Sequence, residues 1–432
     1  MSRMSFQNGL SRRTFLKGLG LAVGASALPG YGVFGQADFV NIGAVVPLTG
    51  QLASFGSRFQ VAAQIAVTEV NVAGGVPGVG LLRLEVRDSG TNPDQGVAAA
   101  EELVNVVGVQ SLFGAAASGV TIPITSVTVP NQVLQISPSA TSPAITTLDD
   151  NDFVFRTAPS DESQGLVLAN LAFSGKGYRK VAIISRNDAY GAGLSDVFKS
   201  AFEEFGGEVT SVSLYDPNTQ DFSAEIAEAT AGNPDAISLI TFDEGEALIS
   251  QMVQQGVTNF DLLVDGNKNQ DLIDRIVAST GPELLEGKVG TGPSPAPTVG
   301  GATFDALYRE QLPEDPFIFT PHSYDAIALL ALSMAAAGED NGVAMRDQLR
   351  NVANPGGDFF TVGELGAAMA AAAGGQDINY EGAAGSQDFD AAGDPEGPQG
   401  LWTIEGGKIK DTGLGACGRD ANGTLTCNVT PL

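Results

Sequence analysis

Apolar runs and amphipathic segments alternate along the first part of the chain. Residues 40–48, VNIGAVVPL, are apolar with little alternation, which is typical of a strand in a sheet buried on both faces. Residues 55–74 predict a helix that ends at Gly74-Gly75. Its apolar face, at spacings of three and four, consists of Phe59, Ala62, Ala66 and Val70. Strands and helices then alternate at 81–89, 93–105, 109–115, 119–131 and 133–139. This order predicts a parallel, doubly wound sheet.

A second series of the same kind follows the segment 153–161, FVFRTAPSD. Its helices and strands are expected, in turn, at 163–175, 180–185, 192–206, 208–215, 221–232, 235–241, 245–256, 261–265 and 269–280. An eight-stranded barrel would share this order, but the pattern breaks at the Pro/Gly-rich stretch 290–301, GTGPSPAPTVGG. The chain therefore predicts two α/β units rather than one barrel.

The remainder predicts a strong helix at 323–338, a loose Gly-rich stretch from about 354 to 400, and hairpins at the end. Because a helix returns after the second unit, the chain is expected to cross between the units more than once. We therefore expect two doubly wound parallel-sheet lobes joined by a hinge with several crossings. The first lobe would hold residues 38–157 with 291–385, and the second 158–290 with 386–432.

The N-terminal stretch 11–24, SRRTFLKGLGLAVG, places paired arginines before a short Gly/Ala/Leu run. A basic patch before a core helix is one interpretation. An export signal is favoured, because a charged region, an apolar region and a small-residue cut follow one another. Arg12 and Arg13 resemble the twin-arginine signal pattern. The predicted signal is residues 1–37, cut after Gly35-Gln36-Ala37, and no cysteine there suggests a lipid anchor.

The four basic residues of this leader are its only charged residues, so its removal takes the formal charge from −28 to −32. Such a polyanion does not bind nucleic acid through a basic face. The negative charge indicates a surface that keeps the protein soluble, or adaptation to a saline habitat. No apolar run long enough to span a membrane remains after cleavage.

The two cysteines, Cys417 and Cys427, flank the sequence GRDANGTLT. A three-residue loop at 421–423 would place them opposite each other in a hairpin, which favours a disulfide. A metal site is less favoured, because the only histidine, His322, lies far away in sequence. Two free buried thiols are the remaining alternative.

The motifs of common catalytic sites are missing. The sequence has no G-x-S-x-G elbow and no Walker loop, and His322 stands just before a helix start, where a polar residue is ordinary. The acidic segment 388–397, DFDAAGDPEG, lacks calcium-loop spacing and is interpreted as a hinge loop. We expect no cofactor, no metal and no enzyme activity.

Small hydroxyl residues gather where strands of the first unit end. The loops are 47–56, PLTGQLASFG; 114–121, GAAASGVT; and 137–143, SPSATSP. Ligands of open parallel sheets bind beyond the carboxyl ends of the strands. Backbone N–H groups there, with the hydroxyls of Ser118, Ser139 and Thr141, predict a neutral cradle for a singly charged carboxylate. Helix capping is the alternative role of such residues.

Facing loops of the second unit carry aromatic and acidic residues: Tyr190, Phe242, Asp243 and Asp265. An aromatic ring can close over an apolar ligand part, and a carboxylate can hold an ammonium group.

Taken in order, these segments resemble the periplasmic branched-chain amino-acid binding proteins of ABC importers. The resemblance rests on PLTG…FG, ISPSATSP, FVFRTAPSDESQG, AYGAGL, SYDAIALLA and GLWTIEGGK, and it spans nearly the whole chain after the leader. It implies a type I fold, with two lobes joined by three crossings that close on a ligand. It also implies ligand contacts at Phe55, Ser118, Ser139, Ala140, Thr141, Tyr190, Phe242 and Asp265.

The resemblance implies a periplasmic receptor that delivers a small amino acid, or a related carboxylate or amide, to the membrane permease of an ABC importer. The sequence departs from the leucine binders at Asp265-Gly266 and after Ser118, where Gly-Val follows. The family also includes binders of urea and aromatic carboxylates. A sensor subunit for a membrane signalling partner is the alternative, and an amidase is a less favoured one.

Overall fold

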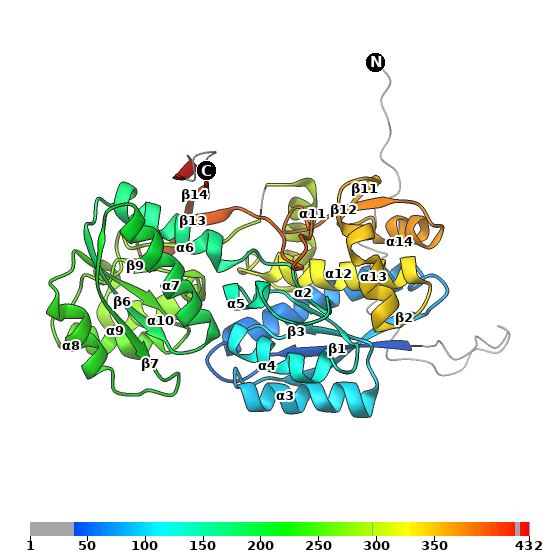
Figure 1. Cartoon of the computed structure of the whole chain (residues 1–432), viewed down its shortest axis with the longest axis horizontal. Coiled ribbons are helices and arrows are strands. Elements are labelled where there is room, and N and C mark those ends of the chain that lie inside the picture. Colours follow the sequence, from blue (N-terminus) through cyan, green and yellow to red (C-terminus); the bar gives the residue numbers. More distant parts are fainter. Residues whose placement is uncertain (1–38, 296, 420–423, 432) are drawn as a thin grey trace, which may run out of the picture.

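The structure is a computed structural model that describes residues 39–295, 297–419 and 424–431. The predicted twin-arginine signal, residues 1–37, and the predicted hairpin loop, 421–423, lie outside the described residues. The described chain forms two α/β lobes that lie side by side (Figure 1).

The first lobe is built on a five-stranded parallel sheet in the order β2-β1-β3-β4-β5. The strands are β1 (Phe39–Val46), β2 (Leu81–Asp88), β3 (Ser111–Gly114), β4 (Leu134–Ser137) and β5 (Val154–Arg156). The helices on one face are α2 (Ala53–Val72), α12 (Thr320–Ala337) and α13 (Gly342–Ala353), and those on the other are α3 (Pro93–Glu102) and α4 (Ser118–Thr128). The predicted doubly wound sheet is confirmed.

Helices α2 and α12 form the centre of this lobe. The expected apolar face of α2 is fully buried, at Phe59, Ala62, Ala66 and Val70. Gly74 and Gly75 follow the helix with φ of 107° and 85°, a backbone region that glycine adopts without steric cost. Helix α12 is buried continuously from Thr320 to Ala335, so it is apolar on nearly every side rather than amphipathic.

The second lobe is built on an eight-stranded sheet in the order β15-β14-β13-β10-β9-β8-β6-β7. Five strands are parallel: β6 (Lys180–Arg186), β7 (Glu208–Tyr215), β8 (Ala236–Ile240), β9 (Leu262–Leu263) and β10 (Val289–Pro293). Three antiparallel strands extend it: β13 (Gln399–Glu405), β14 (Lys408–Arg419) and β15 (Leu425–Pro431). Its helices are α6 (Asp161–Asn170), α7 (Ala189–Glu204), α8 (Ser223–Ala231), α9 (Gly245–Gln254) and α10 (Gln270–Thr280).

The chain passes between the two sheets three times, at 157–160, 294–298 and 382–398. Strand β10 continues to Pro293, three residues past the proposed lobe boundary at 290/291. Beyond the boundary at 385/386, Phe389 contacts Phe155 and Asp394 pairs with Arg156, both at the end of the first sheet. The third crossing therefore packs against the first lobe before β13 begins.

The expectation of a loose stretch from 354 to 400 is wrong over its first half. This part contains β11 (Asp358–Thr361), α14 (Leu365–Ala373) and β12 (Ile378–Glu381), with β11 and β12 forming a small parallel sheet. Helix α14 packs on α12, burying Leu365, Ala368, Met369 and Ala372. Two of these four residues are alanines in an Ala-rich stretch, so composition concealed the apolar face. Helices α5 (Pro143–Thr146) and α11 (Val299–Gln311) are further elements of the first lobe.

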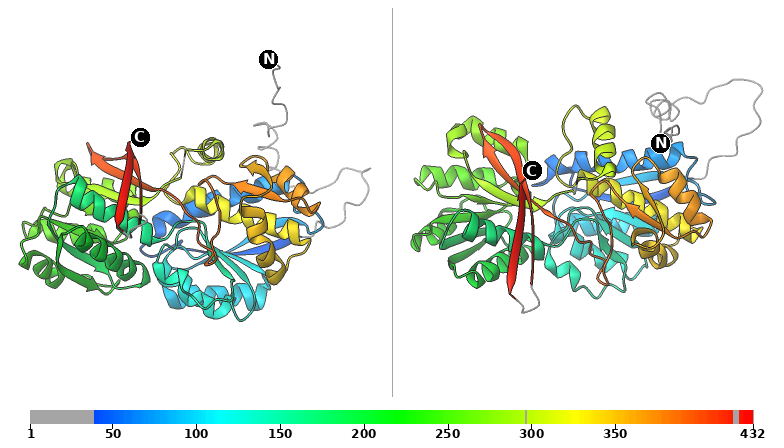
Figure 2. Two further views of the ribbon diagram at one scale, coloured as in Figure 1. Left: turned by 45° about the horizontal axis from the view of Figure 1, so that its top comes forward. Right: turned by 90° about the horizontal axis from the view of Figure 1, so that it is seen from above.

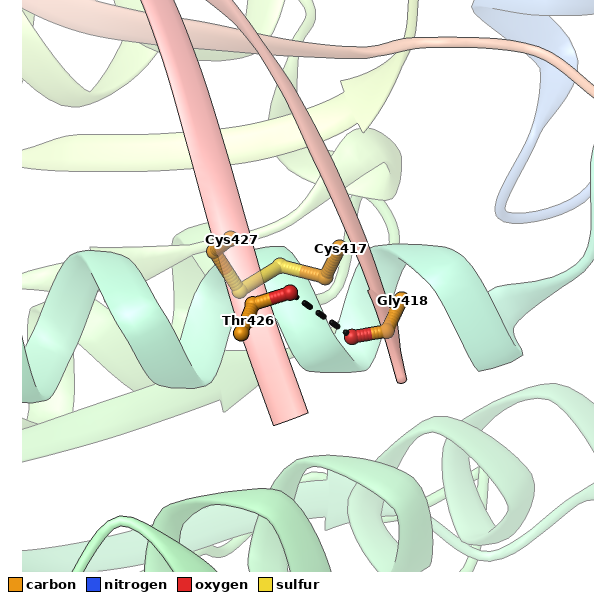
Figure 3. Close-up of a disulfide and its surroundings, with 4 residues drawn as sticks. All are labelled: Cys417, Gly418, Thr426 and Cys427. Carbon is orange, nitrogen blue, oxygen red and sulfur yellow. Dashed lines mark hydrogen bonds between the residues drawn. A yellow bond between two sulfur atoms is a disulfide. The ribbon is translucent and has the colours of Figure 1, made fainter. Parts of the chain in front are cut away.

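The C-terminal hairpin β14–β15 lies against α6 of the second lobe (Figure 2). Cys417 and Cys427 are directly opposite each other in this hairpin and form a disulfide with an S–S distance of 2.01 Å. Beside it, the Thr426 hydroxyl donates to the carbonyl of Gly418 at 3.3 Å (Figure 3). Within the described ranges, no helix combines the length and the apolar character needed to cross a membrane.

Candidate functional site

A small cavity lies between the lobes. It is bounded by the start of α2, by the loops after β3 and β4, by the start of α7, and by the loops after β8 and β9. Its lining residues are Leu52, Phe55, Ala116, Ala117, Ser118, Ser139, Tyr190, Phe242, Asp265, Gly266 and Phe319. No lysine, arginine or histidine is among them.

The first-lobe wall presents hydrogen-bond donors at the N-terminus of α4. Ser118 is the first residue of this 11-residue helix, so the N–H groups of its first turn have no acceptor within the helix. The Ser118 Oγ accepts a bond from the Ser142 N–H at 3.1 Å, which leaves its own hydrogen free to donate. The Ser139 hydroxyl donates to the carbonyl of Ala116 at 3.1 Å and thereby joins the two loops. This end of the cavity suits an anion.

The second-lobe wall presents a buried carboxylate. Asp265 begins a 3-10 helix (Asp265–Asn267) directly after β9 and is 3% exposed. Its Oδ1 accepts bonds from the Tyr190 hydroxyl at 2.6 Å and from the Gln164 Nε2 at 2.8 Å. Burial raises the pKa of Asp265, and these two donors oppose the rise. Burial and the nearby Asp265 charge raise the pKa of the Tyr190 phenol, so this side chain remains a donor.

A second carboxylate, Asp161, lies behind Asp265 at the start of α6. Its side chain is fully buried, and neither carboxylate oxygen has a hydrogen-bond partner among the described residues. Its backbone N–H donates to the carbonyl of Thr141 at 2.8 Å, and the Thr141 hydroxyl is likewise buried without a partner there. Burial, and then the charge of Asp265, raise the pKa of Asp161 well above its ordinary value.

Aromatic rings form the remaining wall. Phe242 stacks on Tyr190 with ring centroids 5.2 Å apart. Phe55 meets Phe317 edge to face at 4.7 Å, and Phe319 meets Phe59 in the same way at 6.4 Å. With Leu52, the rings of Phe55, Phe242 and Phe319 give the cavity an apolar side that contrasts with its polar serine and carboxylate groups.

Six of the eight residues that the sequence proposed for ligand binding line this one cavity: Phe55, Ser118, Ser139, Tyr190, Phe242 and Asp265. Ala140 does not, because its side chain packs with Ile145 and Val154. Thr141 is 1% exposed and lies behind the wall, beside Asp161.

The other five lining residues, Leu52, Ala116, Ala117, Gly266 and Phe319, were not proposed from the sequence, and neither was Asp161 behind the wall. Asp161 follows the N-cap Ser160, where an acid is the ordinary residue of a first helical turn, so its burial left no signal. Phe319 precedes α12 with a φ of 66°, and nothing in its sequence neighbourhood predicts that placement.

The other chemically suggestive residues lie outside the cavity. Asp243 faces Arg275 at 3.3 Å and accepts a bond from Asn269. His322 is buried, and burial lowers its pKa to about 3, so it is neutral. In the segment 388–397, Asp390 accepts bonds from the backbone of its own turn, and Asp394 pairs with Arg156. Among the residues that the structure describes, no cluster of three or more acidic, His or Cys ligands could hold a metal.

Polar contacts close the two lobes on each other beside the cavity. We call Gln51, Ser54 and Arg58 the α2 latch, since they lie at three- and four-residue spacing at the start of that helix. The Gln51 carbonyl accepts from the Asp243 N–H at 3.3 Å, and its side-chain amide donates to the carbonyl of Pro217. The Ser54 hydroxyl accepts from Asn269 at 2.9 Å, and Arg58 pairs with Asp271 at 3.0 Å.

A family match, related sequences and a solved structure all indicate the same family for this chain. A family described as periplasmic binding protein matches residues 40–379. The Leu/Ile/Val-binding protein homolog 1 of Brucella abortus is 32% identical over 332 residues, covering 76% of this chain and 86% of that protein. A chemotactic signal transduction system substrate-binding protein of Halobacterium salinarum, BasB, is 28% identical over 367 residues, covering 82% and 84%. The crystal structure of a leucine-binding protein, LivK, of Thermotoga maritima matches with a TM-score of 0.74 at 25% identity, covering 87% of this chain and 98% of that one.

Proposed function

This chain belongs to the periplasmic binding proteins, and from that premise we propose that it captures an α-amino acid with an apolar side chain and delivers it to an ABC importer. One observation carries the proposal. The interlobe cavity described above has a helix N-terminus on one wall and a buried carboxylate on the facing wall, and no cationic side chain lines it. Opposed sites for one anion and one cation match a zwitterion.

The ligand carboxylate would bind at the first lobe. The N–H groups of Ser118 and Gly119 begin α4, and the Ser118 hydroxyl has a hydrogen to donate. The helix macrodipole adds a favourable interaction with an anion at this end. Because no guanidinium or ammonium lines the cavity, a single negative charge fits better than a phosphate.

The ligand ammonium would bind at the second lobe, against Asp265. The donors already on Asp265 are a phenol and an amide, so its charge has no cationic partner in the described structure. Neither oxygen of Asp161, behind it, has a hydrogen-bond partner among the described residues. A buried carboxylate is costly without a counter-charge, so an ammonium group stabilises this wall.

The apolar side of the cavity would hold the ligand side chain. Leu52, Phe55, Phe242 and Phe319 offer no hydrogen-bonding side-chain atom, so a polar side chain would lose its hydration without replacement. Leucine, isoleucine and valine suit this wall, in agreement with the names of the Brucella and Thermotoga relatives.

Capture would proceed by closure of the lobes without any covalent step. A ligand that contacts both walls binds the closed arrangement more tightly than the open one and shifts the population toward it. The membrane permease would then recognise the closed lobes. We place the protein in the periplasm, exported by the twin-arginine route, on the basis of Arg12, Arg13 and the residues 1–37 that precede the lobes.

Thermal melting with matched ligands tests the proposal. Leucine should raise the melting temperature, whereas isocaproate, which lacks the amine, and isoamylamine, which lacks the carboxylate, should raise it far less. A ligand at about 100 times its Kd stabilises the folded state by about 2.7 kcal/mol. Ser118→Ala should weaken leucine binding. Ser126→Ala is the matched control, because that hydroxyl lies on the same helix, is exposed, and donates to the Pro123 carbonyl. Equal effects of leucine and isocaproate would contradict an ammonium site.

A sensor function is the second candidate. It is favoured by the similarity to the Halobacterium chemotactic signal transduction protein, which covers 82% of this chain. Both functions would use the same cavity and differ only in the membrane partner. Affinity purification from membranes with leucine present distinguishes them, since a permease would be recovered in one case and a signal transducer in the other.

A further inference from the structure

We propose that ligand capture by this protein is a proton exchange: the buried pair Asp161 and Asp265 holds one proton when no ligand is bound and releases it as the ligand ammonium enters. The inference rests on the proposed function, because it needs an ammonium-bearing ligand. It assigns Asp161 a role that goes beyond contact. Asp161 would set the charge balance of the site and couple affinity to pH.

The geometry places two acids in one buried space without a cation. Asp265 starts the 3-10 helix after β9, and Asp161 starts α6; they are 3% and 0% exposed. Asp265 has two uncharged donors, and Asp161 has none on either oxygen within the described residues. The side-chain oxygens of Thr141, Gln164 and Thr291 are also buried without partners there, and the two threonine hydroxyls among them can donate as well as accept. A proton on one carboxyl group supplies both a donor and a reduction of charge.

The charged groups around the pair do not supply the missing positive charge. Arg156, at the end of β5, is the nearest cation, but its Nε and Nη2 both donate to Asp394. Its Nη1 donates to the carbonyls of Ala140 and Ser142. Tyr190, on α7, stays protonated, and His322, at the start of α12, is neutral. Burial and then the charge of Asp265 raise the pKa of Asp161, and the Thr141 hydroxyl and the charge of Arg156 oppose this rise only in part.

The charge balance then fixes the exchange. With both carboxylates ionised, the pair carries two negative charges, and with one proton it carries one. When the ligand ammonium arrives, its positive charge replaces that of the proton, which leaves for solvent. No bond of the ligand forms or breaks, and the charge of the buried pair with its cation is unchanged.

The sign of the pH effect follows from this release. Because the bound state holds fewer protons than the free state, acid opposes binding. In the pH range where the free pair is protonated and the bound pair is not, leucine affinity should fall by up to about tenfold for each unit by which the pH is lowered. It should level off at higher pH, where the free pair has already lost its proton.

Isothermal titration calorimetry of leucine in buffers with low and high ionisation enthalpy measures the proton count directly. In the intact protein the count should approach one proton released per leucine at pH values where the free pair holds its proton, and it should match the slope of log Kd against pH. This comparison needs no variant, so it stays decisive if a substitution disturbs folding.

Asp161→Asn keeps the side-chain shape and removes the charge. It should abolish the proton release and flatten the pH slope, as well as weaken binding. Asp340→Asn is the matched control. Burial raises the pKa of Asp340 to about 6, but it lies past the far end of α12, so its removal should leave the ligand-linked count unchanged.

Two results would overturn the inference. Leucine could bind with the same heat in all buffers and at constant affinity across the pH range, which would show a pair ionised in both states. Alternatively, affinity could depend on sodium and not on pH, which would show a metal cation in the proton's place. By contrast, the absence of any leucine binding at every pH would refute the proposed function itself.

Discussion

Removal of one hydroxyl of the α2 latch, by Ser54→Ala, should weaken ligand binding although Ser54 does not line the cavity. Ser54 Oγ accepts a bond from the Asn269 Nδ2 across the lobe interface at 2.9 Å. In the open arrangement both groups are hydrated in either variant, so the substitution changes only the closed arrangement. A net hydrogen bond contributes about 0.5–1.5 kcal/mol. If closure is required for tight binding, Kd should rise by about 2- to 12-fold.

The neighbouring ion pair is expected to matter less. Arg58 also pairs with Glu314 in its own lobe at 2.7 Å, and the Asp271 side chain is 52% exposed, so the interlobe pair is a surface interaction of about 0–1 kcal/mol. Asn269 keeps a second acceptor, Asp243 at 3.1 Å, after the loss of Ser54, so no buried donor is orphaned. The expected effect of Ser54→Ala therefore stays within the range of a single hydrogen bond.

Calorimetry with leucine gives Kd, and small-angle scattering without ligand gives the mean lobe separation. Thr68→Ala is the matched control, because that hydroxyl lies on the same helix, belongs to a half-buried residue, and donates only to the Gln64 carbonyl. Ser54→Ala should raise Kd and shift the ligand-free scattering toward more open forms, whereas Thr68→Ala should change neither. If Ser54→Ala leaves Kd unchanged while folding normally, interlobe contacts outside the cavity do not set affinity.

Three further outcomes are expected. Tyr190→Phe should raise the leucine Kd by about tenfold, since it removes the 2.6 Å donor from the buried Asp265 at a cost of about 1–3 kcal/mol; calorimetry measures it. The cysteines Cys417 and Cys427 are 10 residues apart, so the loss of loop-closure entropy predicts that reducing their disulfide destabilises the hairpin by about 3 kcal/mol. Amide hydrogen exchange in the hairpin should become faster, and leucine affinity should not change. Burial raises the pKa of Asp325 to about 7, above its ordinary value, so ionisation of this group opposes folding. The contribution of Asp325 to the free energy of unfolding should therefore decrease as pH rises from about 4 to about 7. Urea titrations measure this slope, and Asp325→Asn should flatten it.

The succession of strands and helices and the helix faces could be predicted because the two periodicities are clear in this sequence. The four residues of the α2 face, for example, are spaced for a helix and are all fully buried. The prediction failed over the segment 365–373 because alanine dominates it. Leu365 and Met369 are its only large apolar residues, and such a stretch looks like a flexible linker until α12 supplies the surface that it covers. Composition alone could not distinguish these two outcomes.

The cavity was predictable to the extent that it follows strand ends. Ser118 and Ser139 follow the carboxyl ends of parallel strands of the first sheet, and Asp265 follows the carboxyl end of a parallel strand of the second. Within the loop 137–143, however, adjacent residues point in different directions, so Ser139 lines the cavity while Ala140 packs inward. Leu52 and Phe319 are brought in by packing on α2 and α12, which no local pattern encodes.

Asp265 and Asp161 show where the limit of such reasoning lies and why it matters for function. A carboxylate after a strand suggests a ligand, whereas a carboxylate in a first helical turn suggests only a favourable interaction with the helix dipole. At Asp161 that interaction is present, but the side chain also lies in a space where the nearest guanidinium is already bound to Asp394. The charge state of Asp161 therefore depends on which neighbouring donors already bind other acceptors, and only the folded structure shows this. The same arrangement makes the site selective: an amine can replace a proton between these acids, but an anion lacking an amine leaves the proton in place and gains nothing from the wall that it faces.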